Sequence, residues 1–558
     1  MKKRTGAQAV MESLLQENVK VIFGYPGGAI MPIYDALYDY RDKIQHILTR
    51  HEQGAAHAAE GYARMSGQPG VCFATSGPGA TNLVTGIADA MMDSVPLVCI
   101  TGQVPQAVLG TQAFQEVDII GITKPITKWN IQVTDPSKIG EAIAKGFQIA
   151  ASGRPGPVLI DITKNAQFEA CDFTYQQLPK LPAPKADNKH IQEAADLLNK
   201  AKKPFMIIGH GVRLSEAEGE VCKLAGRAGI PVATTLHGLS SFQCDHDLYV
   251  GMLGMHGNYA PNILTNEADV ILAVGMRFDD RVTGTLKNYA KQAKIIHIDI
   301  SAHELNRLVK TTIAINADAK DALEQLNLLI KRNEHTEWLN AFKKLADEEF
   351  ETVQKEELHP EKGALRMAEV VRLLSDKSNG EAVIVADVGQ HQMAAARYYQ
   401  YKKTNSYITS GGAGTMGYAL PAAIGVKKAK PDREVVAIMG DGGSQMNIQE
   451  LGTIMQEKLP VKIIILNNNH LGLVRQWQEM FFEKRYSFVT LENPDFIQIA
   501  KGYNITGEKV ETREHLAKAL DTLLRSDKPY ILDIRVAQEE NVFPMMPTGA
   551  GVGEMRLK

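Results

Sequence analysis

The chain has little of what marks secreted, membrane or nucleic-acid-binding proteins. Its five cysteines are scattered and include no CxxC pair, which argues against a disulfide framework and predicts buried thiols in a reducing compartment. No apolar run approaches a membrane span, and the basic N-terminus MKKRTGAQAVMESLL lacks the apolar core of a signal peptide. The formal net charge of -3 argues against a basic surface that binds nucleic acid. These absences predict a cytoplasmic protein that binds neither nucleic acid nor membranes.

The sequence pattern is that of an α/β protein, and the chain is long enough for several domains. The 558 residues are too many for one core and suggest three domains. Short apolar runs alternate with amphipathic segments, which is typical of doubly wound parallel sheets covered by helices. A proline- and lysine-rich stretch, 177–189, and a charged segment, 331–365, interrupt this rhythm. We therefore expect three doubly wound domains followed by a tail, with the limits 1–175, 190–335, 360–540 and 541–558.

A bare aspartate among glycines follows one of the apolar runs. Segments 435–439 and 461–466 have the pattern of buried parallel strands, so their carboxyl ends share one edge of a sheet. Asp441 follows the first strand and Asn468 the second, and with the backbone carbonyl of His470 they offer the oxygen ligands that Mg²⁺ prefers. The neighbouring glycines let the backbone approach a phosphate closely: Gly440, Gly442 and Gly443. By itself, a Gly-Asp-Gly turn accounts for this stretch about as well.

The whole pattern is more specific than the turn. A GDG opening with an Asn-Asn close about 27 residues later resembles the thiamine diphosphate motif of thiamine-dependent enzymes. The resemblance implies that Asp441, Asn468 and His470 bind Mg²⁺ against the cofactor's diphosphate. It also implies that Met416 supports the bent cofactor, where pattern alone predicts a core methionine. Further contacts at the diphosphate end are implied for Gly389, Gln390 and His391.

Thiamine chemistry also needs an acid at the far end of the cofactor. A glutamate hydrogen-bonded to the aminopyrimidine promotes the imino form, whose nitrogen removes the thiazolium proton. The stretch HEQGAAHAAEGYARMSG is similar to this region of the family and implies that Glu52 is that acid, although pattern alone makes it an ordinary residue of a first helical turn. Glu60 is the competing candidate and is interpreted as structural. In the family the two regions meet across a subunit interface, which implies at least a homodimer.

Longer motifs narrow the resemblance. YPGGAIMPIYDAL, TSGPGATNLVTGIADAMMDSVPLVCITGQVP, GTQAFQEVDI, GMRFDDRVTG, VRQWQ and VFPMMPTGAG together resemble the large catalytic subunits of the acetohydroxyacid synthase (acetolactate synthase) family. The implied reaction decarboxylates pyruvate and joins the hydroxyethyl enamine to a second 2-oxoacid. Pyruvate as acceptor gives 2-acetolactate and 2-oxobutyrate gives 2-aceto-2-hydroxybutyrate, the entry to branched-chain amino-acid synthesis.

The resemblance also assigns a substrate side. Arg281 is implied to bind the acceptor carboxylate, a task suited to bidentate guanidinium geometry, and Trp477 to contact the extra methyl of 2-oxobutyrate. Further residues are implied to line the approach: Gly28, Phe114, Gln115, Lys164 and Leu473. Pattern alone allows Lys164 to be a surface lysine and Phe114 a core aromatic. Leu473 stands where the family usually has Met, and Gly443-Ser444 where it usually has Ser-Phe.

The arginine–tryptophan pair favours the biosynthetic, FAD-containing branch of the family. Candidate FAD contacts, which also fit ordinary turns after strands, are Arg154, Gly209, His210, Gly211, Thr235, Leu236, Met252, His256, Gly275, Arg277, Asp299 and Asp318. The resemblance implies a dimer or tetramer with a small regulatory subunit, and a C-terminal tail that forms a lid. Two other functions stay open: an FAD-free catabolic acetolactate synthase and an oxidoreductase of the pyruvate oxidase type.

Overall fold

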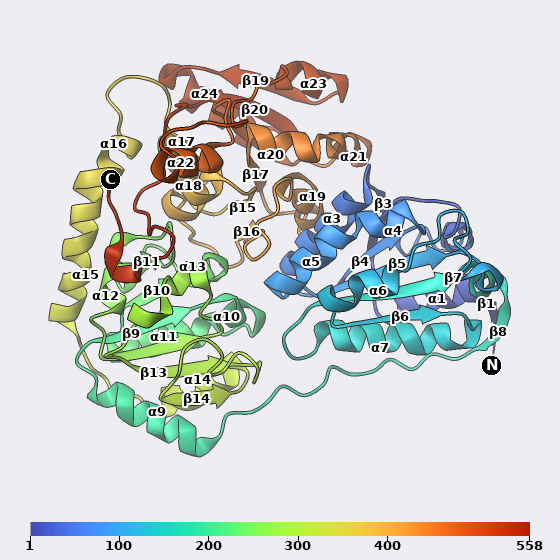
Figure 1. The fold of residues 1–558 in the computed structure, drawn as a ribbon, viewed down its shortest axis with the longest axis horizontal. Helices are drawn as coiled ribbons and strands as arrows, with labels where there is room; N and C mark the ends of the chain where they lie inside the picture. The colour runs from blue at the N-terminus through green and yellow to red at the C-terminus, as the bar shows by residue number, and fades with distance from the viewer. Residues whose placement is uncertain (1) are drawn as a thin grey trace.

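The computed structural model describes residues 2–558, which form three six-stranded sheets in which all paired strands are parallel (Figure 1). This confirms the predicted fold class. The first and third sheets share one strand order, β3-β2-β4-β5-β7-β6 and β16-β15-β17-β18-β20-β19. The central sheet has the order β11-β10-β9-β12-β13-β14, which is that of a Rossmann fold. The positions of the domain limits stay predictions.

The four central strands of the first sheet are fully buried, because helices cover both of its faces, whereas the edge strands β3 and β6 are mostly half-buried. Its strands are β2 (Val21–Gly24), β3 (Gln45–Leu48), β4 (Gly70–Ala74), β5 (Leu97–Gln103), β6 (Trp129–Val133) and β7 (Pro157–Thr163). Its helices are α1 (Gly6–Gln16), α2 (Met31–Tyr38), α3 (Glu52–Ser66), α4 (Pro78–Asn82), α5 (Val84–Asp93), α6 (Ile119–Thr123), α7 (Ile139–Ala151) and α8 (Lys164–Phe168). A separate antiparallel pair joins β1 (Lys2–Thr5) to β8 (Ala170–Phe173).

The central sheet follows an extended linker that crosses from the first domain to α9 (Figure 1). Helix α9 begins at Asn188 rather than after Lys189, because the Asp187 side chain caps it by accepting from the His190 amide. The strands are β9 (Pro204–Ile208), β10 (Val232–Thr234), β11 (Tyr249–Met252), β12 (Val270–Val274), β13 (Lys294–Asp299) and β14 (Ile313–Asn316). The helices are α9 (Asn188–Lys200), α10 (His210–Leu214), α11 (Glu218–Ala228), α12 (Tyr259–Thr265), α13 (Asp280–Thr283) and α14 (Ala319–Leu329).

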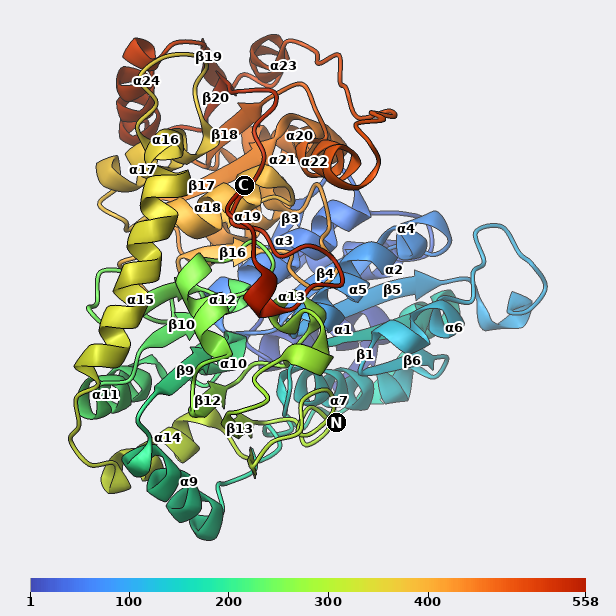
Figure 2. The same cartoon turned by 60° about the vertical axis from the view of Figure 1, so that its left-hand side comes forward.

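The charged segment after the central sheet is helical, as predicted. Helices α15 (Thr336–Glu349) and α16 (Lys355–Leu358) run along one side of the molecule toward the third domain (Figure 2). The third sheet contains β15 (Val383–Ala386), β16 (Tyr407–Thr409), β17 (Val435–Gly440), β18 (Lys462–Asn467), β19 (Thr506–Val510) and β20 (Tyr530–Arg535). Its helices are α17 (Met367–Lys377), α18 (Gln390–Tyr398), α19 (Ala419–Ala429), α20 (Asp441–Met446), α21 (Leu451–Glu457), α22 (Gly472–Phe481), α23 (Phe496–Gly502) and α24 (Arg513–Arg525).

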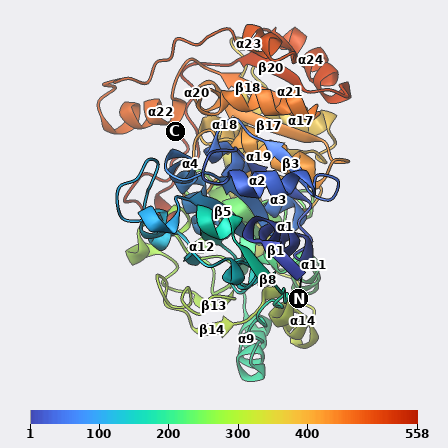
Figure 3. The same cartoon turned by 90° about the vertical axis from the view of Figure 1, so that its right-hand side faces the viewer.

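The first and third domains share one hydrophobic core, formed where α3 packs on α19. The backbones approach so closely that a Cβ at Gly61 would lie 2.1 Å from the Ala422 carbonyl oxygen, and one at Gly425 would lie 1.8 Å from that of Ala58. Glycine is therefore required at positions 61 and 425, where α3 and α19 pack together. Figure 3 shows these domains from the side on which the first domain faces the viewer.

The C-terminal tail returns to the central domain. Met545 and Met546 are buried, and the Met546 amide donates to the Met255 carbonyl at 2.8 Å. The Thr285 amide donates to the Ala550 carbonyl at 2.9 Å. The tail thus lies beside α13, the short helix that carries Arg281, as Figure 2 shows for the red segment next to α13.

Two sequence expectations are settled at this level. Among the described residues, no helix has the length and apolar character needed to cross a membrane. The prediction of buried thiols is right for Cys72 and Cys99, whose sulfur atoms are 3.3 Å apart. It is wrong for Cys171, Cys222 and Cys244, which are only half-buried because they lie at the periphery of the cores.

Candidate active site

The GDG motif lies at the carboxyl edge of the third sheet. Strands β17 and β18 pair in parallel with Gly440 opposite Leu466, so Asp441 and Asn468 emerge at the same edge. Both side chains are almost completely buried. Asp441 is the first residue of α20, where the helix N-terminus adds partial positive charge. The parallel pairing therefore places both residues at the predicted sheet edge, and their role as Mg²⁺ ligands stays a prediction.

Asn493 is a member of this site that the sequence did not reveal. Its side-chain amide donates to Asp441 Oδ2 at 2.6 Å and to Asn467 Oδ1 at 3.1 Å. Burial raises the pKa of Asp441, and the hydrogen bond from Asn493 opposes that rise. Asn493 lies in a coil before α23 with no periodicity or motif around it, so only the fold brings it to the site.

The diphosphate-side residues predicted from the resemblance surround the same edge. Gly389 caps α18, and a Cβ there or at Gly440 would come within 2.9 Å of the His391 ring. Burial lowers the pKa of His391 to about 3, so the ring is neutral, and its Nε2 has no hydrogen-bond partner. Gln390 Oε1 accepts from Asn468 Nδ2 at 3.3 Å.

These features fit a bound diphosphate with Mg²⁺. An orphaned buried ring nitrogen, glycine backbone with no room for side chains, and a carboxylate beside an amide oxygen are the groups such a ligand requires. His470 lies in the loop that carries Asn468, and its backbone amide donates to Asn468 Oδ1 at 3.1 Å. Its backbone carbonyl is the predicted third Mg²⁺ ligand. Met416 faces Gly442, at which a Cβ would lie 3.6 Å from Met416 Cε.

Glu52 lies at the carboxyl edge of the first sheet, as the first residue of α3. Its Oε2 accepts a hydrogen bond from Asn82 Nδ2 at 2.9 Å, and Asn82 is a second residue that the sequence did not single out. Glu60, one helical face away, is fully buried and 2.9 Å from His57 Nδ1. Burial raises the pKa of Glu60 well above its usual range.

The other predicted residues of the first domain follow strands of the same sheet. Gly28 lies in the loop after β2, with open space around its Cα, and Lys164 begins α8 directly after β7. Gln115 has φ +60° and contacts Gly77, while Phe114 is 88% exposed. Among the described residues, no hydrogen bond or ion pair joins Glu52 to Asp441 or Asn468. The chain therefore carries two half-sites, one on each outer sheet.

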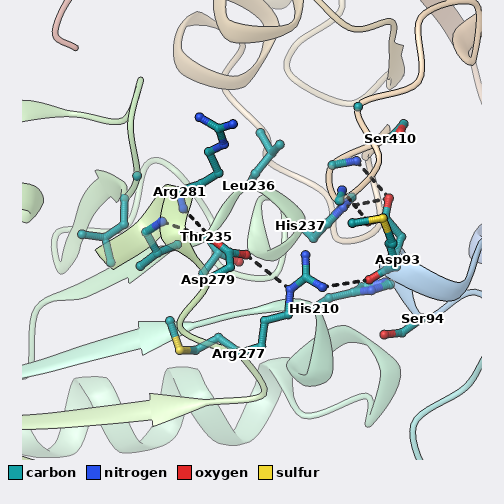
Figure 4. Close-up of a pocket in the computed structure, with 18 of the residues that line it drawn as sticks. Asp93, Ser94, His210, Thr235, Leu236, His237, Arg277, Asp279, Arg281 and Ser410 are labelled. Carbon is teal, nitrogen blue, oxygen red and sulfur yellow. Dashed lines mark hydrogen bonds and ion pairs between the residues drawn. The ribbon is translucent and has the colours of Figure 1, made fainter. Parts of the chain in front are cut away.

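A cavity of about 490 Å³ opens between the three domains. Most of the predicted FAD contacts line it, together with Arg281, Leu473 and Trp477. Figure 4 shows His210, Arg277 and Arg281 among the lining residues. Those FAD contacts are Arg154, His210, Gly211, Thr235, Leu236, Met252, His256, Gly275, Arg277 and Asp299. Gly209 and Asp318 do not line it. A Cβ at Gly209 would lie 2.4 Å from the Gly275 carbonyl, and Asp318 caps α14.

The cavity combines apolar walls with cationic groups. Arg154 lies 3.0 Å from Glu304, and Arg277 Nη1 donates to the Met92 carbonyl at 3.2 Å (Figure 4 shows Arg277). Burial lowers the pKa of His256 to about 3, and the Nε2 of this buried ring has no partner. Burial raises the pKa of Asp299 to about 6. Such a cavity fits an extended ligand with an aromatic part and phosphate groups.

One wall of the cavity is an ion network that the sequence did not predict. Asp93 Oδ2 lies 2.8 Å from Arg64 and 3.0 Å from His237 Nε2, and both of its oxygens accept backbone amides of the 411–412 turn. Figure 4 shows Asp93 and His237. Burial alone would raise the pKa of Asp93, but His237, Arg64 and these amides hold it well below its usual range. The network joins all three domains at the cavity.

Comparison with known proteins agrees with this geometry. Three family models match: the thiamine pyrophosphate enzyme N-terminal TPP binding domain over residues 4–122, the central domain over 191–326 and the C-terminal TPP binding domain over 387–534. The acetolactate synthase isozyme 2 large subunit of Escherichia coli is 44% identical over 99% of both chains. The probable acetolactate synthase large subunit of Methanocaldococcus jannaschii is 44% identical over 98% of this chain and 94% of its own. The chain therefore belongs to the thiamine pyrophosphate enzymes and, within them, to the family of acetolactate synthase large subunits.

Proposed function

We propose that the chain is an acetolactate synthase that condenses decarboxylated pyruvate with a second 2-oxoacid, either pyruvate or 2-oxobutyrate. The observation that carries the proposal is the pair of half-sites, in which Asp441 and Asn468 converge on one sheet edge and Glu52 lies on the corresponding edge of a sheet with the same topology. Family membership over the whole chain supports this reading and does not favour an oxidase or a catabolic synthase.

Each half-site has a task in this reaction. Thiamine diphosphate, when bound, supplies the carbon nucleophile. Asp441, Asn468 and the His470 carbonyl would bind Mg²⁺, and the amides at the start of α20 and the neutral His391 ring would face the diphosphate. Glu52 would exchange a proton with the aminopyrimidine nitrogen from its place among buried groups. Arg281 would bind the acceptor carboxylate, with Gln115, Gly28, Phe114 and Lys164 on the approach.

The two half-sites support a homodimer as the smallest active unit. Each lies on a separate sheet, and a second copy of the chain would place Glu52 of one protomer opposite Asp441 of its partner. The relatives are named large subunits, which supports a small regulatory partner for this chain as well.

The test of the proposed function is product identification. The purified chain with pyruvate, Mg²⁺ and thiamine diphosphate, in the absence of an electron acceptor, is expected to form 2-acetolactate, and 2-aceto-2-hydroxybutyrate when 2-oxobutyrate is added. Acetaldehyde alone, or turnover only after an oxidant is supplied, would contradict the proposal.

We also propose that the cavity between the domains binds FAD. Arg154, Arg277 and the unpartnered His256 ring support a phosphate-bearing aromatic ligand there. The purified chain is expected to show the absorbance bands of oxidised flavin, and heat denaturation is expected to release FAD identified by chromatography. A colourless protein that binds no added FAD in an equilibrium titration would contradict this assignment.

Acceptor choice gives a further prediction, centred on Trp477. Its ring lines the cavity near Leu473 and stacks obliquely on Phe481, with ring centroids 5.1 Å apart. Trp477→Leu is expected to lower the preference for 2-oxobutyrate over pyruvate, because the extra methyl loses its contact surface. One methylene in a pocket corresponds to about 10–200-fold in specificity.

The measurement is a competition assay with both acceptors at fixed ratio. Phe482→Leu is the matched control, since Phe482 is the C-cap of the same helix, is 53% exposed and does not line the cavity. If Trp477→Leu leaves the product ratio unchanged, a residue other than Trp477 distinguishes the acceptors by their extra methyl group.

A further inference from the structure

A buried carboxylate of the third domain contacts the start of the helix that carries Glu52. Glu450 is fully buried and ends the short turn η7 (Ile448–Glu450), which follows α20. Its Oε1 accepts a hydrogen bond from the Arg50 backbone amide at 2.9 Å, and the His51 amide also faces the carboxylate. These amides directly precede Glu52.

The contact is built into both partners. A Cβ at residue 54 would lie 2.5 Å from Glu450 Oε1, so Gly54 leaves the space that the carboxylate occupies. Thr453 Oγ1 lies 2.7 Å from Glu450 Oε2 and 3.1 Å from the Leu48 carbonyl at the end of β3. Each oxygen of the buried carboxylate therefore has a partner.

The Arg50 side chain makes further hydrogen bonds between the segment before α3 and the third domain. Its Nη2 donates to the Gly452 carbonyl at 3.1 Å and to Gln456 Oε1 at 2.9 Å, while its Nη1 donates to the Leu48 carbonyl at 2.9 Å. The segment that connects β3 to α3 is thereby fixed on η7 and α21 of the third domain. Burial raises the pKa of Glu450 to about 7, and Thr453 and the backbone amides oppose that rise.

We propose that Glu450 is a positioning residue for Glu52. Its carboxylate fixes the backbone at residues 50 and 51, so that the first turn of α3 presents the Glu52 carboxyl in one orientation. The same residue lies nine positions after Asp441 on the chain segment that forms the Mg²⁺ half-site, so it ties the geometry of one half-site to that of the other. This inference rests on the role proposed for Glu52.

The first measurement needs no cofactor. Amide hydrogen exchange of the full-length chain is followed in a peptide covering residues 46–58, for the native chain, Glu450→Ala and Glu450→Gln. Loss of the acceptor is expected to speed exchange there by about tenfold in the alanine variant and less in the glutamine variant, which keeps one acceptor oxygen.

Glu349→Gln is the matched control. Glu349 is another buried carboxylate that accepts a backbone amide at a helix start, that of Tyr259 at 2.7 Å. It is expected to change exchange near residue 259 and not at 46–58.

The second measurement is the rate of hydrogen–deuterium exchange at the thiazolium carbon of bound thiamine diphosphate, read by proton NMR after acid quench. Glu450→Ala is expected to slow it by on the order of 10–100-fold, because small displacements of a catalytic group have effects of this size. Glu450→Gln is expected to recover part of the rate. Gly54→Ala, which pushes the carboxylate away without changing charge, is expected to slow it as well.

The outcomes separate the two ideas. If Glu52→Gln abolishes this exchange while Glu450→Ala leaves it and the 46–58 peptide unchanged, the positioning role is overturned and the role of Glu52 stands. Faster amide exchange with an unchanged thiazolium rate also overturns it, since Glu450 is then only structural. If Glu52→Gln itself leaves the rate unchanged, both assignments fall.

Discussion

Glu52→Gln is expected to lower the turnover of pyruvate by on the order of 10²–10⁴-fold, the usual contribution of a positioned acid–base group. The glutamine side chain has nearly the same shape and can still accept from Asn82, whose amide is 2.9 Å from Glu52 Oε2. What it lacks is the ability to exchange a proton with the aminopyrimidine. The fold should therefore survive while the chemical step is lost.

The measurement is the steady-state rate of acetolactate formation together with the affinity for thiamine diphosphate. A fall in the rate with little change in cofactor affinity supports an acid–base role, whereas an equal loss of both would indicate that Glu52 only binds the cofactor. Glu60→Gln is the matched control on the same helix. The buried Glu60 carboxyl has a pKa raised well above its usual range, so the neutral amide changes its charge least.

Asp441→Ala is expected to raise the apparent dissociation constant for Mg²⁺ by at least about 100-fold, because even residues behind a metal ligand are worth 10–100-fold. The variant removes the one carboxylate of the proposed donor set and leaves the Asn493 amide, which donates to Asp441 Oδ2 at 2.6 Å, with Asn467 Oδ1 as its remaining acceptor. Cofactor binding should weaken in parallel, since in the proposed site Mg²⁺ would help to hold the diphosphate.

Calorimetric titration of thiamine diphosphate at several fixed Mg²⁺ concentrations gives both constants. Asp161→Asn is the control for loss of a buried strand carboxylate. Asp161 is fully buried in the first sheet, where it accepts from Thr101 at 2.6 Å, far along the chain from the Mg²⁺ half-site. A normal Mg²⁺ dependence in Asp441→Ala would remove Asp441 from the proposed metal site.

The sequence was most informative where function depends on residues close together in the chain. Asp441 and Asn468 were predictable because a strand–helix–strand crossover has one hand and places both strand ends at one edge. The role of Glu52 was predicted from the family resemblance alone, because a glutamate in the first turn of a helix carries no functional signal of its own. Most of the expected FAD contacts followed central-sheet strands, and the cavity gathers all of them except Gly209 and Asp318.

The sequence by itself determined the α/β class, the linker and the residues that follow each strand, because these depend on apolar periodicity and on local turn chemistry. Tertiary structure alone decided which loops meet. Asn493 reaches Asp441, Glu450 reaches Arg50, and Asp93 of the first domain joins Arg64 to His237 of the central domain. The first contact depends on the path of the coil before α23, and the other two on how α3 packs on α19 and how the sheets are oriented; none of these properties leaves a periodic signal in the chain.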